Sequence, residues 1–351
     1  MKKKIFCILD DDKTQYMKQY GEIIGLEIVI PPIKRKTLFC FYLLKCVLTF
    51  RKPDAVIIRY LNDKKSFLHS FLIFVLNYAT FVVAKVSGVK IIWFCHNIDR
   101  ETIEYHPFLI RLQRVFLEKY SSRIYVMDEL LIEVAKKQFP KVTDKIDFIS
   151  FGMRENPYLR GGDGDNELLI NAVNEIRSVN SNAIIGFCPT NCGDKYLHIK
   201  YSADLVESCK NAGLDVYIIL VGKLENYLEL RPKIKNSLYK SDRVILIDKF
   251  VHYDATEVGK CIDFYWRGLN DQSISYSLYE AASQKRPTLS LNVGFVGVAV
   301  EYYNLGAIVE LDMNNCESSI NRIRHWDSSY ASDFLSSHSW YLTVEKIKHS
   351  L

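Results

Sequence analysis

The fold of this chain is decided by one stretch, Gly268-Leu-Asn-Asp-Gln-Ser-Ile-Ser-Tyr-Ser-Leu-Tyr-Glu-Ala-Ala-Ser-Gln-Lys-Arg-Pro287. It predicts the end of a strand, a short polar loop and a helix that carries Glu280. Backbone N–H groups at Ser273 to Tyr276, where this helix opens, can bind phosphates because a helix N-terminus carries partial positive charge. Glu280 lies about two turns further on, where its carboxylate can accept hydrogen bonds from both hydroxyls of a ribose. The stretch therefore predicts a nucleotide diphosphate site, although an ordinary amphipathic helix of an α/β domain gives a similar pattern.

Length and composition indicate a globular protein of two domains. The chain has 351 residues, which is long for a single hydrophobic core. Its hydrophobic content of 48% and charged fraction of 25% are typical of globular proteins. Residues 154–166 are rich in Gly and Asp and carry no apolar period. We therefore expect a first domain over 1–160, a linker region over 161–180 and a second domain over 181–351.

The cysteines and the amino terminus favour a cytoplasmic protein. The nine cysteines are scattered, form no Cys-x-x-Cys pair and have no His at the spacing of a zinc site. The amino terminus, Lys2-Lys-Lys-Ile-Phe-Cys-Ile-Leu-Asp10, turns acidic after five apolar residues, which is too short for a signal-peptide core. We expect a first strand there and no structural metal.

Strands and helices alternate along the whole chain, which predicts parallel sheets with crossover helices. The expected strands are 4–9, 26–30, 55–60, 90–95, 123–127, 146–151, 183–188, 215–221, 244–247, 262–266, 288–291 and 307–310. The expected helices are 13–24, 37–50, 66–86, 107–121, 129–138, 198–212, 224–236 and 273–284. Two Rossmann-like, doubly wound α/β domains that face each other across a cleft are the simplest architecture, with ligands at the carboxyl ends of the strands.

The opening stretch also resembles the donor-binding segment of GT-B glycosyltransferases, the two-domain enzymes that use nucleotide sugars. In that family an acid, seven residues and a Glu are followed by Ala and, shortly after, by Pro. Gln272 stands here in place of the first acid, and Glu280 is the Glu. Ser273 and Ser275 replace a glycine-rich turn. Lys285 takes a helix-ending position where Gly is favoured, because that position adopts a left-handed backbone.

Other landmarks of the resemblance follow in order along the chain. Ile185-Gly-Phe-Cys-Pro-Thr190 and then Lys195 resemble the opening strand and loop of the second domain, where the family offers an Arg and a Lys to the diphosphate. Thr190 stands in place of that Arg. Lys249-Phe250-Val251 resembles the turn that contacts the nucleotide base. Ser339-Trp340 opens a helix of the type that crosses back onto the first domain.

The resemblance implies a family-four-like glycosyltransferase of the kind that builds bacterial surface polysaccharides. Its donor would be a nucleotide sugar and its acceptor a hydroxyl of a lipid-linked molecule or a glycan. The implied donor-binding residues are Thr190, Lys195, Phe250, Asp271, Gln272, Ser273, Ile274, Ser275 and Glu280. Because Lys195 and the helix start can offset the charge on the leaving diphosphate, we expect neither a metal nor a cofactor.

The first domain offers a second group of polar side chains after the expected strand 90–95. His96 and Asn97 follow that strand, and Asp99 and Glu101 come next. The His-Asn step after a buried strand also resembles the first domain of many GT-B enzymes. We expect His96 to contact the reacting centre, with Asp99 or Glu101 as the base if the sugar's configuration is inverted. The sequence leaves retention and inversion open.

Charge and apolar segments predict a peripheral membrane position. Residues 1–150 carry 25 Lys and Arg against 16 Asp and Glu, whereas the remainder has a net charge of −4. A basic surface next to apolar segments suits an anionic membrane, here the inner face of the cell membrane, or a phosphate-bearing acceptor. The apolar run Phe67 to Val83 is slightly short for a span, so we expect a buried or membrane-facing helix. Leu38 to Leu44, preceded by Lys34, Arg35 and Lys36, is compatible with the same surface. No RNA- or DNA-binding pattern is present, and nucleic acid is not an expected partner.

Three other interpretations remain. Asp10-Asp11-Asp12 could hold a metal on a diphosphate, as in the GT-A class, although the motif there lies well inside the nucleotide-binding domain. The same run with Pro53 to Ile58 resembles a phospho-receiver domain, but Arg59 stands where the phosphorylated Asp would be. A GT-B-like fold that binds another transferase without catalysis is favoured by the missing first acid and the missing Arg.

Overall fold

The computed structural model describes residues 3–8, 11–33, 35–59, 63–99, 105–153, 163–191 and 193–351, with backbone alone at 11, 12, 163 and 164. The chain divides into two compact units. The first comprises Met1–Gly152 and His338–Leu351, and the second comprises Met153–Ser337. Each unit is built around one six-stranded sheet in which every strand pair is parallel.

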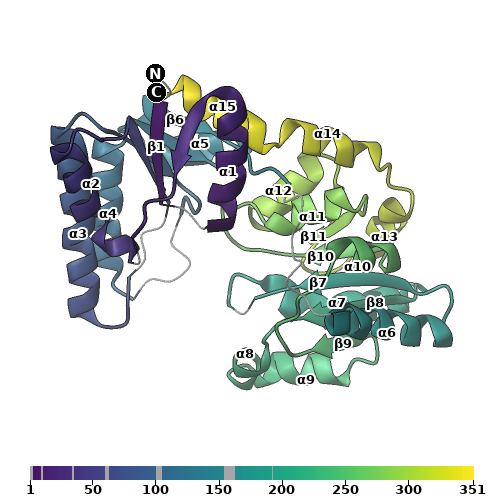
Figure 1. The fold of residues 1–351 in the computed structure, drawn as a ribbon. Helices are drawn as coiled ribbons and strands as arrows, with labels where there is room; N and C mark the ends of the chain where they lie inside the picture. The colour runs from purple at the N-terminus through teal and green to yellow at the C-terminus, as the bar shows by residue number, and fades with distance from the viewer. Residues whose placement is uncertain are drawn as a thin grey trace. The chain divides into compact units, whose positions relative to one another are not determined.

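The first sheet has the strand order β2-β1-β3-β4-β5-β6. Its strands are β1 (Lys3–Ile8), β2 (Leu26–Val29), β3 (Ala55–Ile58), β4 (Lys90–Phe94), β5 (Arg123–Val126) and β6 (Ile146–Phe148). The helices of this unit are α1 (Asp11–Ile24), α2 (Phe39–Leu48), α3 (Phe67–Val86), α4 (Pro107–Tyr120), α5 (Ile132–Gln138) and α15 (Trp340–His349). Helix α3 packs between α2 and α4 (Figure 1), and α1 packs on α15. Most strand residues are apolar because crossover helices cover a parallel sheet on both faces.

The last helix, α15, belongs to the first unit although it comes from the end of the chain. The Trp340 ring stacks on Tyr16 of α1 with ring centroids 5.8 Å apart. Lys346 forms an ion pair with Asp147 at 2.8 Å. Gly152 leaves room for this docking, since a Cβ at that position would collide with Trp340. These contacts close the first unit with a helix that follows the whole second unit in sequence.

The second sheet has the strand order β12-β11-β10-β7-β8-β9. Its strands are β7 (Ile184–Pro189), β8 (Val216–Val221), β9 (Val244–Ile247), β10 (Phe264–Arg267), β11 (Thr288–Leu291) and β12 (Gly306–Val309). The helices are α6 (Asp163–Val179), α7 (Leu197–Asn211), α8 (Glu225–Glu229), α9 (Pro232–Lys240), α10 (Ala255–Cys261), α11 (Tyr276–Ser283), α12 (Gly294–Tyr302), α13 (Cys316–Arg324) and α14 (Ser329–Ser337). The chain adds strands outward from β7 on one side and then from β10 on the other. The boundary between β7 and β10 is therefore the topological switch point.

All twelve expected strands are present, and the prediction of parallel, doubly wound sheets is confirmed. The prediction of a linker over 161–180 is wrong. Residues Asp163–Val179 form helix α6, and Leu169, Val173 and Ile176 lie in the core of the second unit. The first turn of this helix is polar, and its apolar face begins only at the second turn. The start of the segment therefore has the composition of a loop. Helices α10, α12, α13 and α14 were not expected, and Pro232 divides the expected helix 224–236 into α8 and α9.

Helix α3 has an unusual surface for a crossover helix. By length and composition it is the one described helix that could cross a membrane. Only four of its 20 residues are buried, namely Ser70, Thr80, Phe81 and Ala84. Of the two expected alternatives, a buried or a membrane-facing helix, the structure excludes the buried one, because only a narrow stripe of the helix contacts the rest of the unit. Most of the Phe, Leu and Val side chains of α3 face outward.

Candidate functional site

The predicted donor-binding residues come together at the switch point of the second sheet. The loop after β7 carries Thr190 and Lys195, and the loop after β10 runs from Gly268 to Ser275. The two loops are joined by a bridge between Tyr196 and Leu269 and by the Asn270 N–H, which donates to the Lys195 carbonyl at 2.9 Å. Open parallel sheets bind ligands where strand ends separate at such a point. The two loops form one continuous surface there.

Lys195 and Asp271 form an ion pair on this surface. The Lys195 ammonium lies 3.0 Å from Asp271 Oδ2, and the two side chains are only 18% and 5% exposed. The Asp271 carbonyl accepts a hydrogen bond from the Phe295 N–H at 2.9 Å. Gly294, at a φ of +56°, allows this approach, because a Cβ there would collide with the Leu269 carbonyl. The sequence predicts Lys195 and Asp271 as separate donor contacts, and the structure makes them a fixed pair.

The other oxygen of the Asp271 carboxylate is buried. Asp271 Oδ1 has no hydrogen-bond partner within the described ranges of the chain. A buried carboxylate oxygen without a donor costs free energy that a ligand donor can recover. The position is therefore suited to a polar ligand group.

Glu280 is held by two buried tyrosines. Its Oε1 accepts hydrogen bonds from the hydroxyls of Tyr253 at 2.7 Å and Tyr265 at 3.1 Å. Burial, followed by the nearby charge of Glu280, raises the pKa of both tyrosines well above its ordinary value. Both phenols therefore stay neutral and act as donors that orient the carboxylate. The sequence analysis missed both tyrosines, since each reaches Glu280 from another part of the chain.

The helix that carries Glu280 begins later than expected. Helix α11 starts at Tyr276, with Ser275 as its N-cap residue. The Ser275 side chain makes no capping bond to the helix backbone and instead lies 2.6 Å from the Ser277 hydroxyl. The N-cap side chain, which most often accepts hydrogen bonds from the backbone N–H groups of the first turn, thus does not do so here.

Gln272, Ser273 and Ile274 form the loop before the N-cap residue, and all three are half-buried. Neither Gln272 nor Ser273 makes a side-chain hydrogen bond to any residue that the structure describes. These side chains keep their hydrogen-bonding capacity for a ligand.

His198 joins the two loops. It is fully buried, and its Nε2 lies 2.8 Å from the Thr190 hydroxyl while its Nδ1 lies 3.0 Å from the Gly268 carbonyl. Burial and then the charge of Arg267 lower the pKa of His198 to about 3, so the ring is neutral at physiological pH. Thr190, which stands in place of the family's Arg, is therefore part of the contact through His198 that links the two loops. The sequence analysis missed His198, which lies inside α7.

Arg267 is a buried cation that the sequence analysis also missed. It ends β10 and is 3% exposed. Its Nη1 donates to the Pro189 carbonyl at 2.6 Å, directly before Thr190. Its Nε has no hydrogen-bond partner in the part of the chain that the structure covers. Burying a guanidinium with so few hydrogen-bond acceptors costs folding free energy. Arg267 also brings positive charge to the switch point. A charged residue that closes the buried strand Phe-Tyr-Trp-Arg was the signal available in the sequence.

Phe250 lies in the turn after β9 and is 59% exposed. Its ring meets the edge of His252 with centroids 4.8 Å apart. The turn is anchored by Asp165 of α6, which accepts from Lys249 Nζ at 2.8 Å and from the His252 N–H at 2.9 Å. These bonds lower the pKa of Asp165. Because β7, β8 and β9 are parallel neighbours, Phe250 shares the sheet edge that carries Thr190.

In the first unit, His96 lies in a basic cluster around Phe151. The His96 ring meets the edge of the Phe151 ring with centroids 5.0 Å apart. Lys13 Nζ and Arg59 Cζ lie 4.8 and 5.8 Å from the centre of the same ring. Both basic side chains are buried. Lys13 lies in the first turn of α1 and Arg59 directly follows β3, and the sequence analysis did not assign either to a site.

Of the two predicted bases near His96, the structure describes one. Asp99 is exposed, and Glu101 lies outside the described residues. The loop between them and β4 is held by Arg114, whose guanidinium donates to the carbonyls of Asn97 and Ile98, each at 2.8 Å. The structure thus fixes the loop but leaves Asp99 in water.

A buried carboxylate that the sequence analysis missed follows β3. Asp63 Oδ2 accepts from the backbone N–H groups of Tyr105 at 2.9 Å and His106 at 2.6 Å. Its Oδ1 is buried and has no partner within the ranges that the structure describes. Asp63 is a further candidate for a polar role at this edge of the first sheet.

No protein-family model matches the chain, and no curated protein matches its sequence. Solved structures do resemble it over nearly the full length. A glycosyltransferase from Rickettsia africae is 14% identical, with a TM-score of 0.64 and 99% and 97% of the two chains covered. Anabaena HepE, solved in complex with UDP-glucose, is 13% identical, with a TM-score of 0.64 and 99% and 100% covered. WaaG, a glycosyltransferase involved in lipopolysaccharide biosynthesis, is 11% identical, with a TM-score of 0.57 and 98% of each chain covered.

These similarities define the class of fold. The chain has the GT-B fold of glycosyltransferases, as its sequence predicts. At such low identity they establish the architecture alone, and the activity has to be argued from the residues at the switch point.

Proposed function

We propose that the protein is a glycosyltransferase that uses a nucleotide-sugar donor. The observation that carries the proposal is the Glu280 carboxylate, which Tyr253 and Tyr265 hold beside the switch point of a GT-B fold. A carboxylate oriented in this way can accept hydrogen bonds from the hydroxyls of a ribose, and such charge-assisted bonds are strong. HepE, which shares the fold, was solved with UDP-glucose. Release of a nucleoside diphosphate from a panel of nucleotide sugars is the assay that tests the proposal.

The diphosphate of the donor would lie over the paired loops. Lys195 is oriented by Asp271 at 3.0 Å, and the first turn of α11 presents backbone N–H groups. Arg267 adds a buried positive charge next to Thr190, where the family's Arg is missing. Fixed positive groups of this kind stabilise the charge that develops on a leaving diphosphate. Asp271 or Gln272 would contact the donor sugar, and the exposed ring of Phe250 would pack on the base.

The acceptor would bind in the first unit. His96, Lys13 and Arg59 surround Phe151 and suit an acceptor that carries phosphate, such as a lipid-linked sugar or a charged glycan. His96 would contact the reacting centre. Asp99 or Glu101 would be the base in an inverting reaction, and Asp63 is a third candidate.

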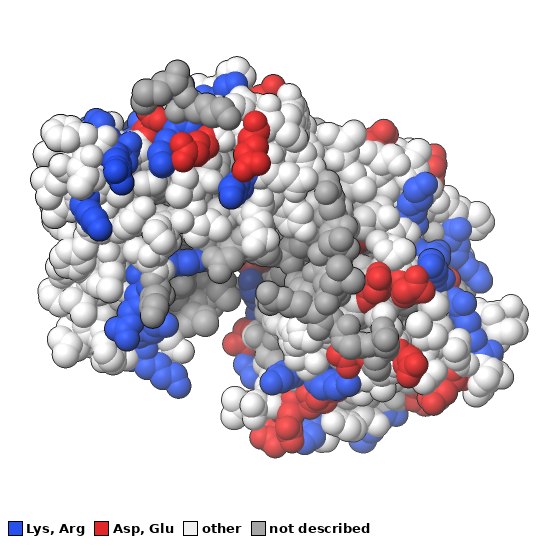
Figure 2. Space-filling model, viewed as in Figure 1, with Lys and Arg blue, Asp and Glu red and all other residues white. Residues whose placement is uncertain are grey.

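We further propose that the protein binds the cytoplasmic face of the cell membrane through the α2–α3 face. This face comprises the exposed apolar residues Leu38, Phe41, Leu44, Leu48, Phe50, Phe67, Leu68, Phe71, Leu72, Val75, Tyr78, Val82 and Val86. A groove of about 560 Å³ adjoins it, lined in part by Arg35, Lys64, Lys65 and His69. Figure 2 shows Lys and Arg side chains at the upper and the lower end of the region where Figure 1 places α2 and α3, with uncharged side chains between them. A large apolar surface rimmed by cations is typical of a protein that inserts side chains into an anionic bilayer.

We expect charge reversal at this rim to release the protein from membranes. The variant with Arg35, Lys64 and Lys65 changed to Glu should bind anionic vesicles at least tenfold more weakly, because each basic residue near such a surface contributes about 1 kcal/mol. Added salt should likewise weaken the binding of the wild-type protein to anionic vesicles. Liposome sedimentation at low and high salt measures both effects.

The matched control reverses two exposed lysines of α9, Lys233→Glu and Lys240→Glu, and should leave vesicle binding unchanged. Equal binding of the wild-type protein to anionic and neutral vesicles, or to neither, would assign the basic rim to a soluble acceptor instead.

We expect turnover to persist in excess chelator, because Lys195, Arg267 and the start of α11 supply the positive charge that a metal would otherwise provide. The competing interpretation places a divalent ion on the Asp10–Asp12 run, which lies outside the described side chains. Steady-state turnover with and without chelator separates the two. Complete loss of activity that magnesium or manganese restores would favour the acidic run.

A non-catalytic GT-B-like partner of another transferase is the alternative function. It is favoured by Gln272 and Thr190, which replace the acid and the Arg of the family pattern. Binding of nucleotides without turnover of any nucleotide sugar would support it.

A further inference from the structure

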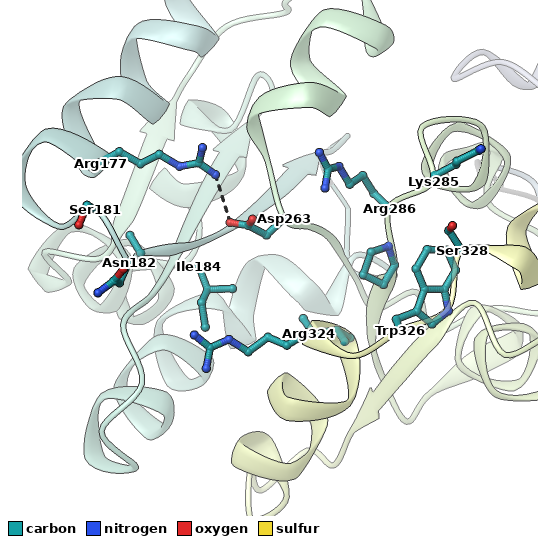
Figure 3. A pocket seen from close by; sticks show the side chains of 13 residues that line it. Arg177, Ser181, Asn182, Ile184, Asp263, Lys285, Arg286, Arg324, Trp326 and Ser328 are labelled. Atoms are coloured by element: carbon teal, nitrogen blue, oxygen red, sulfur yellow. Dashed lines mark ion pairs between the residues drawn. The ribbon is translucent and has the colours of Figure 1, made fainter.

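Figure 3 shows a second pocket, which lies in the second unit. It has a volume of about 520 Å³, and its lining includes Ile184, Asp263 and Pro287. These three residues stand at the amino ends of β7, β10 and β11. Strand β7 spans six residues, which corresponds to roughly 15–20 Å. The pocket is therefore a separate site from the switch point.

The lining of this pocket is strongly basic. It contains four basic side chains and one acid, namely Arg177, Lys285, Arg286, Arg324 and Asp263. Figure 3 shows the guanidinium end of Arg177 directed at Asp263, Arg286 on the other side of Asp263 and the Arg324 guanidinium beside Ile184. The Lys285 ammonium lies at the far edge of the view, directed away from Arg324. The formal charge of the lining is thus positive by three. Such a charge favours an anionic ligand.

Two of these cations have no partner of their own. Arg177 lies 3.5 Å from Asp263, and Arg286 Nε donates to the Gly259 carbonyl at 2.7 Å. The side chains of Lys285 and Arg324 make no hydrogen bond or ion pair with any residue in the described ranges. The charges of Lys285 and Arg324 are accordingly available to a ligand.

The backbone at Lys285 is the second observation. Helix α11 ends at Ser283, and Lys285 follows in the left-handed region with a φ of +50°. Its N–H donates to the Ala282 carbonyl at 3.0 Å, so the turn that ends the helix needs this conformation. Gly adopts it without the steric cost that a Lys side chain brings. The chain thus keeps a less stable residue at a position where its side chain lines the pocket, as is typical of functional strain.

An apolar wall stands beside the cations. The Trp326 indole N–H donates to the Asn304 carbonyl at 2.6 Å, which fixes the ring. Ile184, Pro287 and Ile323 complete the apolar part of the lining. Pockets of this size with a few convergent polar groups are typical of small-molecule sites.

We propose that this pocket binds a small phosphorylated molecule with an apolar or planar body. The charge of its phosphate is met by Arg324 and by Lys285, whose flexible side chain turns in from the far edge of the pocket when the ligand binds, beside the guanidinium groups of Arg177 and Arg286, which are already held in place. The body of the ligand lies against Trp326 and Pro287. This site is independent of the donor site proposed above.

Phenyl phosphate is the probe, because it joins a phosphate to a planar ring and is not a nucleotide. The readout is the indole N–H resonance of Trp326 in the full ¹⁵N-labelled chain, which has four tryptophans. Trp326→Phe identifies that resonance by its loss. We expect phenyl phosphate to shift it saturably and to bind roughly tenfold or more tightly than phenol or inorganic phosphate.

The deciding variant combines Lys285→Gly and Arg324→Ala, which removes only side chains without partners. This double variant should bind phenyl phosphate roughly tenfold or more weakly than the wild type. Lys285→Gly alone should keep or raise the melting temperature while it weakens binding, so stability and affinity change in opposite directions. Glu280→Ala should leave the titration unchanged. The proposal is overturned if the Trp326 resonance does not move, if the double variant binds like the wild type, or if Glu280→Ala abolishes the shift.

Discussion

Glu280→Ala is expected to weaken binding of the donor nucleotide by about 1.5–3 kcal/mol, or roughly 10- to 150-fold. The carboxylate is oriented before any ligand arrives, because Tyr253 and Tyr265 both donate to its Oε1. Loss of an oriented, charged acceptor removes the bonds to the ribose hydroxyls without changing the surface that binds the phosphates. Titration calorimetry with UDP, GDP and ADP measures the effect.

Two further variants make the Glu280 result specific. Glu280→Gln keeps an acceptor for the tyrosines but lacks the charge, so it should retain the fold and lose most of the same affinity. Glu257→Ala removes an exposed carboxylate of α10 that pairs with Lys260 on the surface, and it should leave nucleotide affinity unchanged. Wild-type affinity in folded Glu280→Ala protein would remove this residue from the site.

His96→Ala is expected to lower turnover by roughly 10²-fold or more, if His96 assists proton transfer or holds the reacting groups. Nucleotide binding should barely change, because His96 belongs to the first unit and the donor residues belong to the second. Steady-state kinetics combined with calorimetry separate these two effects. Asp99→Asn, Glu101→Gln and Asp63→Asn, made alongside, show which carboxylate acts as a base.

The ring contact between His96 and Phe151 calls for a packing control. His96→Phe keeps an aromatic ring against Phe151 but lacks the imidazole nitrogens, so it should be as inactive as the Ala variant. His349→Ala, an exposed histidine at the end of α15, should be fully active. Near-normal turnover of His96→Phe would make His96 a structural residue at the end of β4.

The strands and the members of the donor site could be predicted because both depend on local sequence. Apolar runs of strand length mark all twelve strands. Glu280 could be predicted as a ligand contact from its spacing after the polar loop that precedes its helix. The partners of these residues could not be predicted. Tyr253 precedes Glu280 by 27 positions and Asp271 follows Lys195 by 76, so each contact depends on how the strands are ordered in the sheet.

Two features of the fold could not be predicted, for physical causes of the same kind. Residues 161–180 begin with Gly and Asp, which are typical of a linker, yet Asp165 in the first turn of α6 anchors the turn that carries Phe250. A carboxylate at a helix start is favourable, so a polar start does not exclude a helix. The apolar character of α3 was evident in the sequence. Which of its faces lacks a partner depends on the packing of α2 and α4.

The central claim is that the second unit binds a nucleotide diphosphate at the switch point between β7 and β10. A thermal-shift screen of the full chain with nucleotides and nucleotide sugars tests it most directly, because a ligand that binds only the native state stabilises it by about 2.7 kcal/mol at 100 times its Kd. We predict that at least one nucleoside diphosphate or its sugar raises the melting temperature of the wild-type protein and leaves that of Glu280→Ala nearly unchanged. A screen in which no nucleotide shifts the wild-type protein, or in which Glu280→Ala is stabilised equally, would contradict the claim.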